Sequence, residues 1–162
     1  MSFTKQRRLL APGEPASDFR LPLLGGGETT LRDLISDGPA LLAFFKVSCP
    51  VCQLTLPFLE RIQSSARLPI YGVSQNDARD TRDFHRRFGV TFPTLLDSEE
   101  AGFVVSNAFG ISSVPTLFLI ETHGSIAHVI EGWSKSEVER LGALAGVKPF
   151  QPNDSVPEWK AG

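Results

Sequence analysis

Cysteine is scarce in this chain of 162 residues, which has two cysteines, one methionine and one tyrosine. Two thiols exclude a framework of several disulfides, and they cannot form a four-cysteine metal site within one chain. The histidines, His85, His123 and His128, show no ligand spacing with the cysteines. A metal ion could therefore enter only by sharing between two chains, and we expect no bound metal.

The sequence also lacks a long apolar run and an excess of charge. No stretch approaches the roughly 20 apolar residues that cross a bilayer, and the formal net charge is −2. We therefore expect neither a membrane nor a nucleic acid as a partner. The basic start, residues 1–10, has no apolar core of about seven residues or more, so it does not resemble a signal peptide. We expect a cytoplasmic protein, in which a thiol pair is active rather than permanently bridged.

The composition is that of one globular domain. A hydrophobic content of 41% over 162 residues suffices for one sizeable core. We predict a lead-in over residues 1–11, a domain over residues 12–147 and a proline-rich tail over residues 148–162. The tail shows little periodicity, so we expect it to lie loosely on the surface or to be disordered. Phe150 and Trp159 could instead anchor it.

Both cysteines lie in one motif, Cys49-Pro50-Val51-Cys52, directly after the apolar run over residues 40–45. The spacing places both sulfurs on the first turn of the following helix, close enough to form a disulfide. Because a structural bridge across so short a loop would add little stability, the motif indicates thiol–disulfide exchange. The non-enzymatic alternative is a protein that binds a soft metal such as copper(I) through the two thiolates.

The segments after the lead-in alternate between strand and helix patterns. This alternation predicts an α/β domain with a central mixed sheet and helices on both faces. In such sheets functional residues gather at the carboxyl ends of strands, which is where Cys49 falls. The predicted strands cover residues 40–46, 69–74, 92–96, 116–120 and 126–130, the predicted helices cover residues 49–65, 77–89, part of 98–109 and 134–144, and a small hairpin or extended segment lies around Gly25.

Residues 44–52, which contain both cysteines, and residues 110–120 resemble the thioredoxin-like superfamily. Residues 12–19 and 72–93 resemble its redoxin branch, which includes bacterial thiol-disulfide oxidoreductases and the alkyl hydroperoxide reductase and thiol-specific antioxidant relatives. The resemblance implies a thioredoxin-like α/β fold with an N-terminal extension and an inserted strand and helix. It also implies a thiol-disulfide oxidoreductase without a bound organic cofactor.

By this resemblance Cys49 is the attacking thiol and Cys52 the resolving thiol. The position of Cys49 leads to the same roles, because the free N–H groups and the dipole at a helix N-terminus favour a thiolate. There we expect the thiol pKa to fall from near 8.5 to about 3.5–7.5. Lys46 could lower this pKa further if its ammonium group approaches the sulfur, or it could simply face solvent.

Pro115 is the second predicted site residue. In the superfamily the matching proline follows a cis peptide bond and lies against the active-site disulfide. The backbone of the preceding residue, here Val114, is then free to pair with an extended segment of a partner. Only before proline does a cis bond cost little, so we expect one here rather than a trans proline at a strand start. The expected partner is a protein or small thiol that carries a disulfide or a dithiol.

The chain departs from the superfamily around the cysteines. A tryptophan usually precedes the first cysteine, whereas Ser48 takes this place and could cap the helix. Acids are common at the positions of Ala43 and Thr55, so the usual base that deprotonates Cys52 is missing. The remaining candidates for this base are water, Lys46, Asp97 and Glu131.

A thiol-dependent peroxidase is the alternative enzymatic function. Peroxiredoxins carry Thr or Ser three residues before, and Pro seven residues before, the cysteine that reduces the peroxide. Counting back from Cys49 gives Lys46 and Leu42, and counting back from Cys52 gives Cys49 and Phe45. Neither cysteine has the peroxidase pattern, which favours thiol–disulfide exchange.

Overall fold

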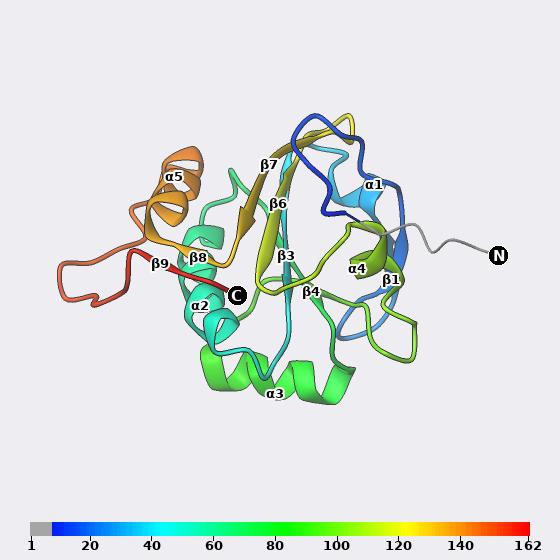
Figure 1. Cartoon of the computed structure of the whole chain (residues 1–162), viewed down its shortest axis with the longest axis horizontal. Coiled ribbons are helices and arrows are strands. Elements are labelled where there is room, and N and C mark those ends of the chain that lie inside the picture. Colours follow the sequence, from blue (N-terminus) through cyan, green and yellow to red (C-terminus); the bar gives the residue numbers. More distant parts are fainter. Residues whose placement is uncertain (1–7) are drawn as a thin grey trace.

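The structure, a computed structural model, describes residues 8–162 (Figure 1). The prediction that the chain start is no signal peptide, and most of the predicted lead-in, concern residues 1–7 and lie outside the described residues. In chain order the elements are β1 (Arg20–Pro22), β2 (Glu28–Thr30), α1 (Leu31–Leu34), β3 (Ala40–Phe45), α2 (Pro50–Gln63), β4 (Ile70–Ser74), α3 (Ala78–Phe88), β5 (Thr94–Leu96), α4 (Val104–Ala108), β6 (Thr116–Ile120), β7 (Ile126–Glu131), β8 (Trp133–Ser134), α5 (Lys135–Ala145) and β9 (Trp159–Lys160).

A five-stranded mixed sheet in the order β5-β4-β3-β6-β7 forms the centre of the molecule. β4 lies parallel to β3 and β5 parallel to β4, whereas β6 is antiparallel to both β3 and β7. Figure 1 shows α2 and α5 on one side of this sheet and α1 and α4 on the other. The thioredoxin-like α/β fold predicted from the sequence is confirmed.

The central strand β3 explains why its sequence reads as a continuous apolar run. All six of its residues are fully buried, as expected for a strand that is covered on both faces. Phe44 lies 5.2 Å from Phe109, between ring centroids, on one face of the sheet. Phe45 lies 5.1 Å from Phe84 of α3 on the other face, because successive strand residues point to opposite sides.

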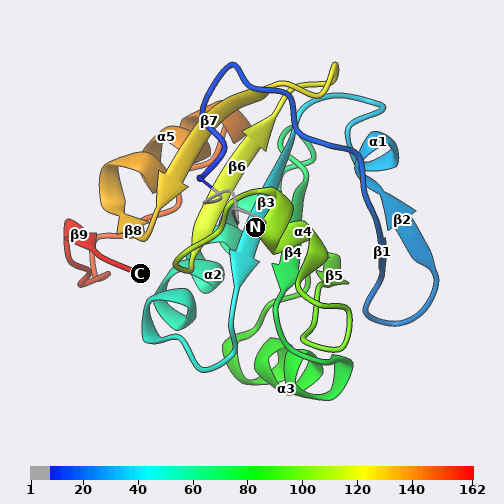
Figure 2. The ribbon, with the colours of Figure 1, turned by 45° about the vertical axis from the view of Figure 1, so that its right-hand side comes forward.

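The N-terminal hairpin closes the β5 edge of the sheet. β1 pairs with β2 in an antiparallel hairpin, as the glycine-rich stretch around Gly25 indicates. Figure 2 shows this hairpin beside β5, where the Leu24 N–H donates to the Thr94 carbonyl at 2.8 Å. The strand at the opposite edge of the sheet is β7, which lies next to the C-terminal elements.

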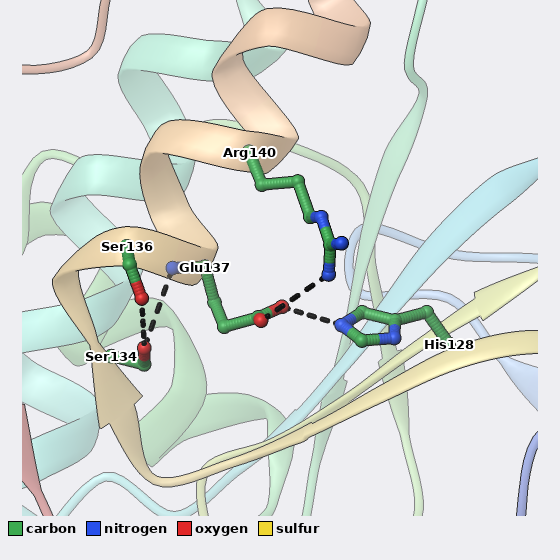
Figure 3. A network of polar contacts seen from close by, with 5 residues as sticks. All are labelled: His128, Ser134, Ser136, Glu137 and Arg140. Atoms are coloured by element: carbon green, nitrogen blue, oxygen red, sulfur yellow. Dashed lines mark hydrogen bonds and ion pairs between the residues drawn. The ribbon is translucent and has the colours of Figure 1, made fainter.

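Helix α5 is fixed to β7 by a polar network, drawn in Figure 3. The Glu137 carboxylate lies between His128 of β7 and Arg140, whose Nη1 is 3.5 Å from the Glu137 Oε1. Ser134 caps the helix, because its Oγ accepts the Glu137 N–H at 3.3 Å. The predicted helix start at Ser134 is thus confirmed, with Ser134 as its cap.

The tail, residues 148–162, is ordered against the body, and the prediction of a loose or disordered tail is wrong. The Phe150 ring packs on Phe58 and Trp133, with centroid distances of 5.0 and 6.0 Å. Strand β9 pairs with β8, so Trp159 anchors the tail through its backbone while its side chain stays 64% exposed. The prolines suppress periodicity but permit contacts made by single side chains and a two-residue strand.

No helix within residues 8–162 is long and apolar enough to cross a membrane.

Candidate active site

Cys49 lies between the end of β3 and the start of α2, where it caps the helix itself. Its backbone is extended, and its Sγ accepts the Cys52 N–H at 3.1 Å. Pro50 follows at the first helical position, where the missing N–H of proline is harmless. The prediction that Ser48 caps the helix is therefore wrong, because the cap position is that of the next residue, Cys49, whose sulfur binds an amide of the first turn.

The two cysteines are free thiols in very different surroundings. Cys49 is half-buried, whereas Cys52 is 0% exposed. Burial raises the pKa of the Cys52 thiol far above its ordinary value, and its contact with Cys49 raises it further. The backbone and the positive charge of Lys46 act in the opposite direction but are weaker. Cys52 thus stays protonated at neutral pH, as a shielded thiol behind an accessible one.

The loop before β6 brings Val114 and Pro115 to Cys49. The Val114–Pro115 peptide bond is cis, as expected from the sequence. The Cys49 thiol donates to the Val114 carbonyl oxygen at 3.4 Å. The Pro115 carbonyl accepts the Gly132 N–H at 2.8 Å, which ties this loop to the end of β7. The two segments singled out in the sequence therefore meet at one site.

Lys46 is exposed at the end of β3, close to both cysteines. Its carbonyl accepts the Cys49 N–H at 3.3 Å, and its charge acts on the pKa of Cys52. The loop that follows it is fixed at Val47, whose N–H donates to Asn76 and whose carbonyl accepts from Gln53, both at 3.0 Å. The backbone of Lys46 is thus fixed beside the thiol pair, whereas its side chain is exposed.

A polar cavity of about 190 Å³ opens beside Val114, and Lys46 is its one charged lining residue. Sequence reasoning missed most of its walls, because the polar residues of α4 and of the loop before β6 carry no spacing signal. The position of Lys46 and Gln75 directly after β3 and β4 was the available indication. The lining residues are Lys46, Gln75, Phe103, Ser106, Asn107, Ile111, Ser112, Ser113 and Val114.

Of the two acids proposed from the sequence, one is bound to other groups and the other is exposed. Asp97 is buried, and its carboxylate accepts the N–H groups of Val105 and Ser106 at 3.2 and 2.6 Å. Glu131 is exposed at the end of β7. Neither is among the groups that shift the pKa of Cys52. Of the three side chains considered as a base, Lys46 is the one whose charge lowers the pKa of this thiol.

Two of the three histidines take part in structural contacts. The His85 Nε2 lies 2.9 Å from the Thr94 Oγ1, and His128 contacts Glu137 (Figure 3). Within residues 8–162 no three or more His, Cys, Asp or Glu side chains are grouped so as to hold a metal ion. Neither histidine completes a site with the cysteines.

A mixed sheet with a Cys-x-x-Cys pair at a strand-to-helix junction, opposite a cis proline, defines a thioredoxin-like redox protein. The AhpC/TSA family model matches residues 12–129, and the chain belongs to this family. It is 33% identical over 153 residues to the thiol-disulfide oxidoreductase ResA of Halalkalibacterium halodurans, covering 91% of this chain and 84% of that protein. The ResA of Geobacillus kaustophilus is 30% identical over the same shares.

Solved structures agree on the fold. A putative thiol:disulfide interchange protein DsbE from Chlorobium tepidum matches with a TM-score of 0.72 and 22% identity, over 83% of this chain and 95% of that one. The thioredoxin domain of a thiol-disulfide oxidoreductase from Bacteroides vulgatus matches with a TM-score of 0.73 and 19% identity, over 84% and 99%. The protein is a thiol-disulfide oxidoreductase.

Proposed function

We propose that Cys49 attacks the partner disulfide and that Cys52 resolves the resulting mixed disulfide. The observation that supports these roles most is the contrast between a half-buried Cys49 that caps α2 and a fully buried Cys52 three residues later. An attacking thiolate must reach its partner, whereas a resolving thiol needs to reach only the first sulfur.

Two exchange steps balance the reaction. The Cys49 thiolate attacks one sulfur of the partner, the partner S–S bond breaks, and the first partner thiolate leaves. Cys52 then loses its proton and attacks the Cys49 sulfur, which releases the second partner thiolate and leaves a Cys49–Cys52 disulfide. Two electrons pass to the partner, and a cellular dithiol returns them to the enzyme; the reverse sequence oxidises a dithiol.

Val114 and Pro115 form the docking site for the partner in this proposal. The Val114 carbonyl lies beside the attacking sulfur, so an extended segment paired there would present its disulfide to Cys49. In this proposal the charge of Lys46 favours the thiolate of Cys52. Ser48 does not cap α2, so it has no part in tuning the thiols. A cytoplasmic location stays a prediction, which cell fractionation tests.

The first experiment is a redox titration of the pair against defined dithiol buffers, read as the mass shift on alkylation. A reduction potential of about −270 mV marks a thioredoxin-like reductant and one of about −120 mV marks an oxidant. A pair that never equilibrates would contradict thiol–disulfide exchange. Cys52→Ser should accumulate the mixed disulfide and Cys49→Ser should form none; the opposite result would exchange the two roles.

A further inference from the structure

Residues 158–162, here called the strap, lie across the residue that should receive the partner. A Cβ atom placed on Gly162 would be 2.3 Å from the Val114 carbonyl oxygen and 3.3 Å from the Pro115 nitrogen. The backbone of Gly162 is therefore in direct contact with Val114, which is only 9% exposed. Figure 1 shows the red end of the chain running from β9 toward the middle of the molecule.

Specific contacts hold the strap in this position. β9 pairs antiparallel with β8, so that Trp133 faces Lys160. The Lys135 N–H donates to the Glu158 carbonyl at 2.9 Å, and the Trp133 indole N–H donates to the carbonyl of Pro157, just before the strap, at 2.6 Å. Both bonds end on backbone carbonyls just before β9, and the Trp159 side chain contributes little because it is exposed.

Gly132 makes the close approach possible. A Cβ atom at this position would lie 2.4 Å from the Lys160 carbonyl oxygen, so any larger residue would push the strap outward. Its φ of 73° is also one that residues with side chains rarely adopt. The same glycine donates its N–H to the Pro115 carbonyl. One residue thus connects the strap to the loop that carries Val114.

The strap leaves the other side of Val114 open. The polar cavity that Lys46 and Val114 line contains no residue of the strap, and Cys49 stays half-buried rather than fully covered. Because Cys49 keeps part of its surface exposed, a small disulfide can reach it while the strap is in place. An extended peptide that pairs with the Val114 backbone cannot, because Gly162 occupies the adjoining space.

We propose that the strap determines substrate specificity: while it is docked, Cys49 exchanges with small disulfides, and protein disulfides react only when the strap leaves Val114. The inference rests on the proposed function, since it takes Cys49 as the attacking thiol. A partner that binds only the undocked form has an apparent affinity equal to its intrinsic affinity multiplied by the undocked fraction. The bonds made and broken are those of the exchange reaction described above.

The test compares two disulfide probes on the reduced full-length protein and its variants. The probes are insulin, whose disulfides lie in a polypeptide, and 2-hydroxyethyl disulfide, which has no backbone to pair. Deletion of residues 159–162 should raise the rate with insulin about tenfold by making the docking edge permanently available. The rate with 2-hydroxyethyl disulfide should change by less than about twofold, because this probe has no backbone that must pair with Val114.

Two full-length variants complete the design. Lys160→Pro should act like the deletion, because proline has no N–H and fits poorly in a paired strand. Trp159→Ala is the matched control and should leave both rates unchanged, since it keeps the backbone pairing and removes an exposed side chain. An unchanged rate with insulin in both strap variants, or an equal rise with both probes, would overturn the inference. A full-length protein that reacts with neither probe would overturn the proposed function itself.

Discussion

At the scale of single residues, the site depends on the unequal surroundings of two thiols in one helical turn. The sulfur of Cys49 is at the N-terminus of α2 and accepts the Cys52 N–H, whereas Cys52 itself is buried in the core. Burial penalises the charged form, so Cys52 holds its proton long after an exposed thiol has lost it. Release of the mixed disulfide should therefore be the step that depends on pH.

This pH dependence can be measured with the chromogenic disulfide 5,5′-dithiobis(2-nitrobenzoate). Reaction at Cys49 releases one thionitrobenzoate, and attack by Cys52 releases the second. Because the Cys52 pKa is raised above the neutral range, its thiolate fraction and the second rate should grow about tenfold per pH unit from pH 6 to 8. A second rate that is flat over this range would contradict a shielded resolving thiol. Cys52→Ser, which cannot release the second group, is the control.

Lys46 should matter for the same step. Its charge favours the Cys52 thiolate, so Lys46→Met should raise the thiol pKa further and slow the second release. A purely electrostatic effect of one exposed charge corresponds to about threefold, whereas loss of a general base would cost about a hundredfold or more. The size of the change therefore separates the two roles. Lys148→Met, in the tail, is the matched control and should leave the rate unchanged.

At the scale of elements, local signals predicted those helix ends that depend on neighbouring residues alone. Asp77 caps α3 by accepting the Asp80 N–H at 2.9 Å, and Gly89 ends it in the left-handed conformation, both as predicted. The start of α2 was predicted to within one residue, but its cap was not, because cysteine is not a usual cap and serine seemed the better candidate. At the start of α2 the functional residue Cys49 occupies the cap position, where serine would be favoured if only helix capping mattered.

The cap of α5 offers a test of such local signals. Ser134→Ala removes the acceptor of the Glu137 N–H and should lower the free energy of unfolding by about 1 kcal/mol. Ser136→Ala, two residues further along, leaves that acceptor in place and should change stability by less than about 0.5 kcal/mol. Urea unfolding of both variants measures the difference. Equal effects would show that the capping bond does not stabilise α5.

His85 connects α3 to β5 and should make stability depend on pH. Burial lowers the pKa of this histidine, although Glu60 acts in the opposite direction. The unfolded chain therefore binds a proton at a higher pH than the folded protein, so stability should fall as the pH drops below about 6.5. His85→Gln should flatten this part of the stability curve, while His123→Gln, at an exposed position, should not. Unfolding at pH 7 and 5 checks both.

At the scale of the whole molecule, periodic patterns and motifs in the sequence predicted the main elements and the site, whereas features without such a pattern were missed. The order of strands and helices, the position of Cys49 and the approach of Pro115 follow from periodicity and from two motifs. The tail and the cavity depend on single long-range contacts, such as Arg61 with Asp154 at 2.7 Å, that no local pattern encodes. The strap also depends on such contacts, since the close approaches at Gly132 and Gly162 and the two-residue strand β9 set its position.

The packing of the tail should contribute to global stability. Phe150 fills the space against Phe58 and Trp133, so Phe150→Ala should lower the free energy of unfolding by about 2 kcal/mol. Trp159→Ala removes an even larger ring, but one that is 64% exposed, and should cost less than about 0.5 kcal/mol. Urea unfolding of both variants gives the comparison. If the tail made no stabilising contacts with the body, both variants would have equal, small effects on the free energy of unfolding. The contacts of Phe150 require the loss in Phe150→Ala to exceed that in Trp159→Ala.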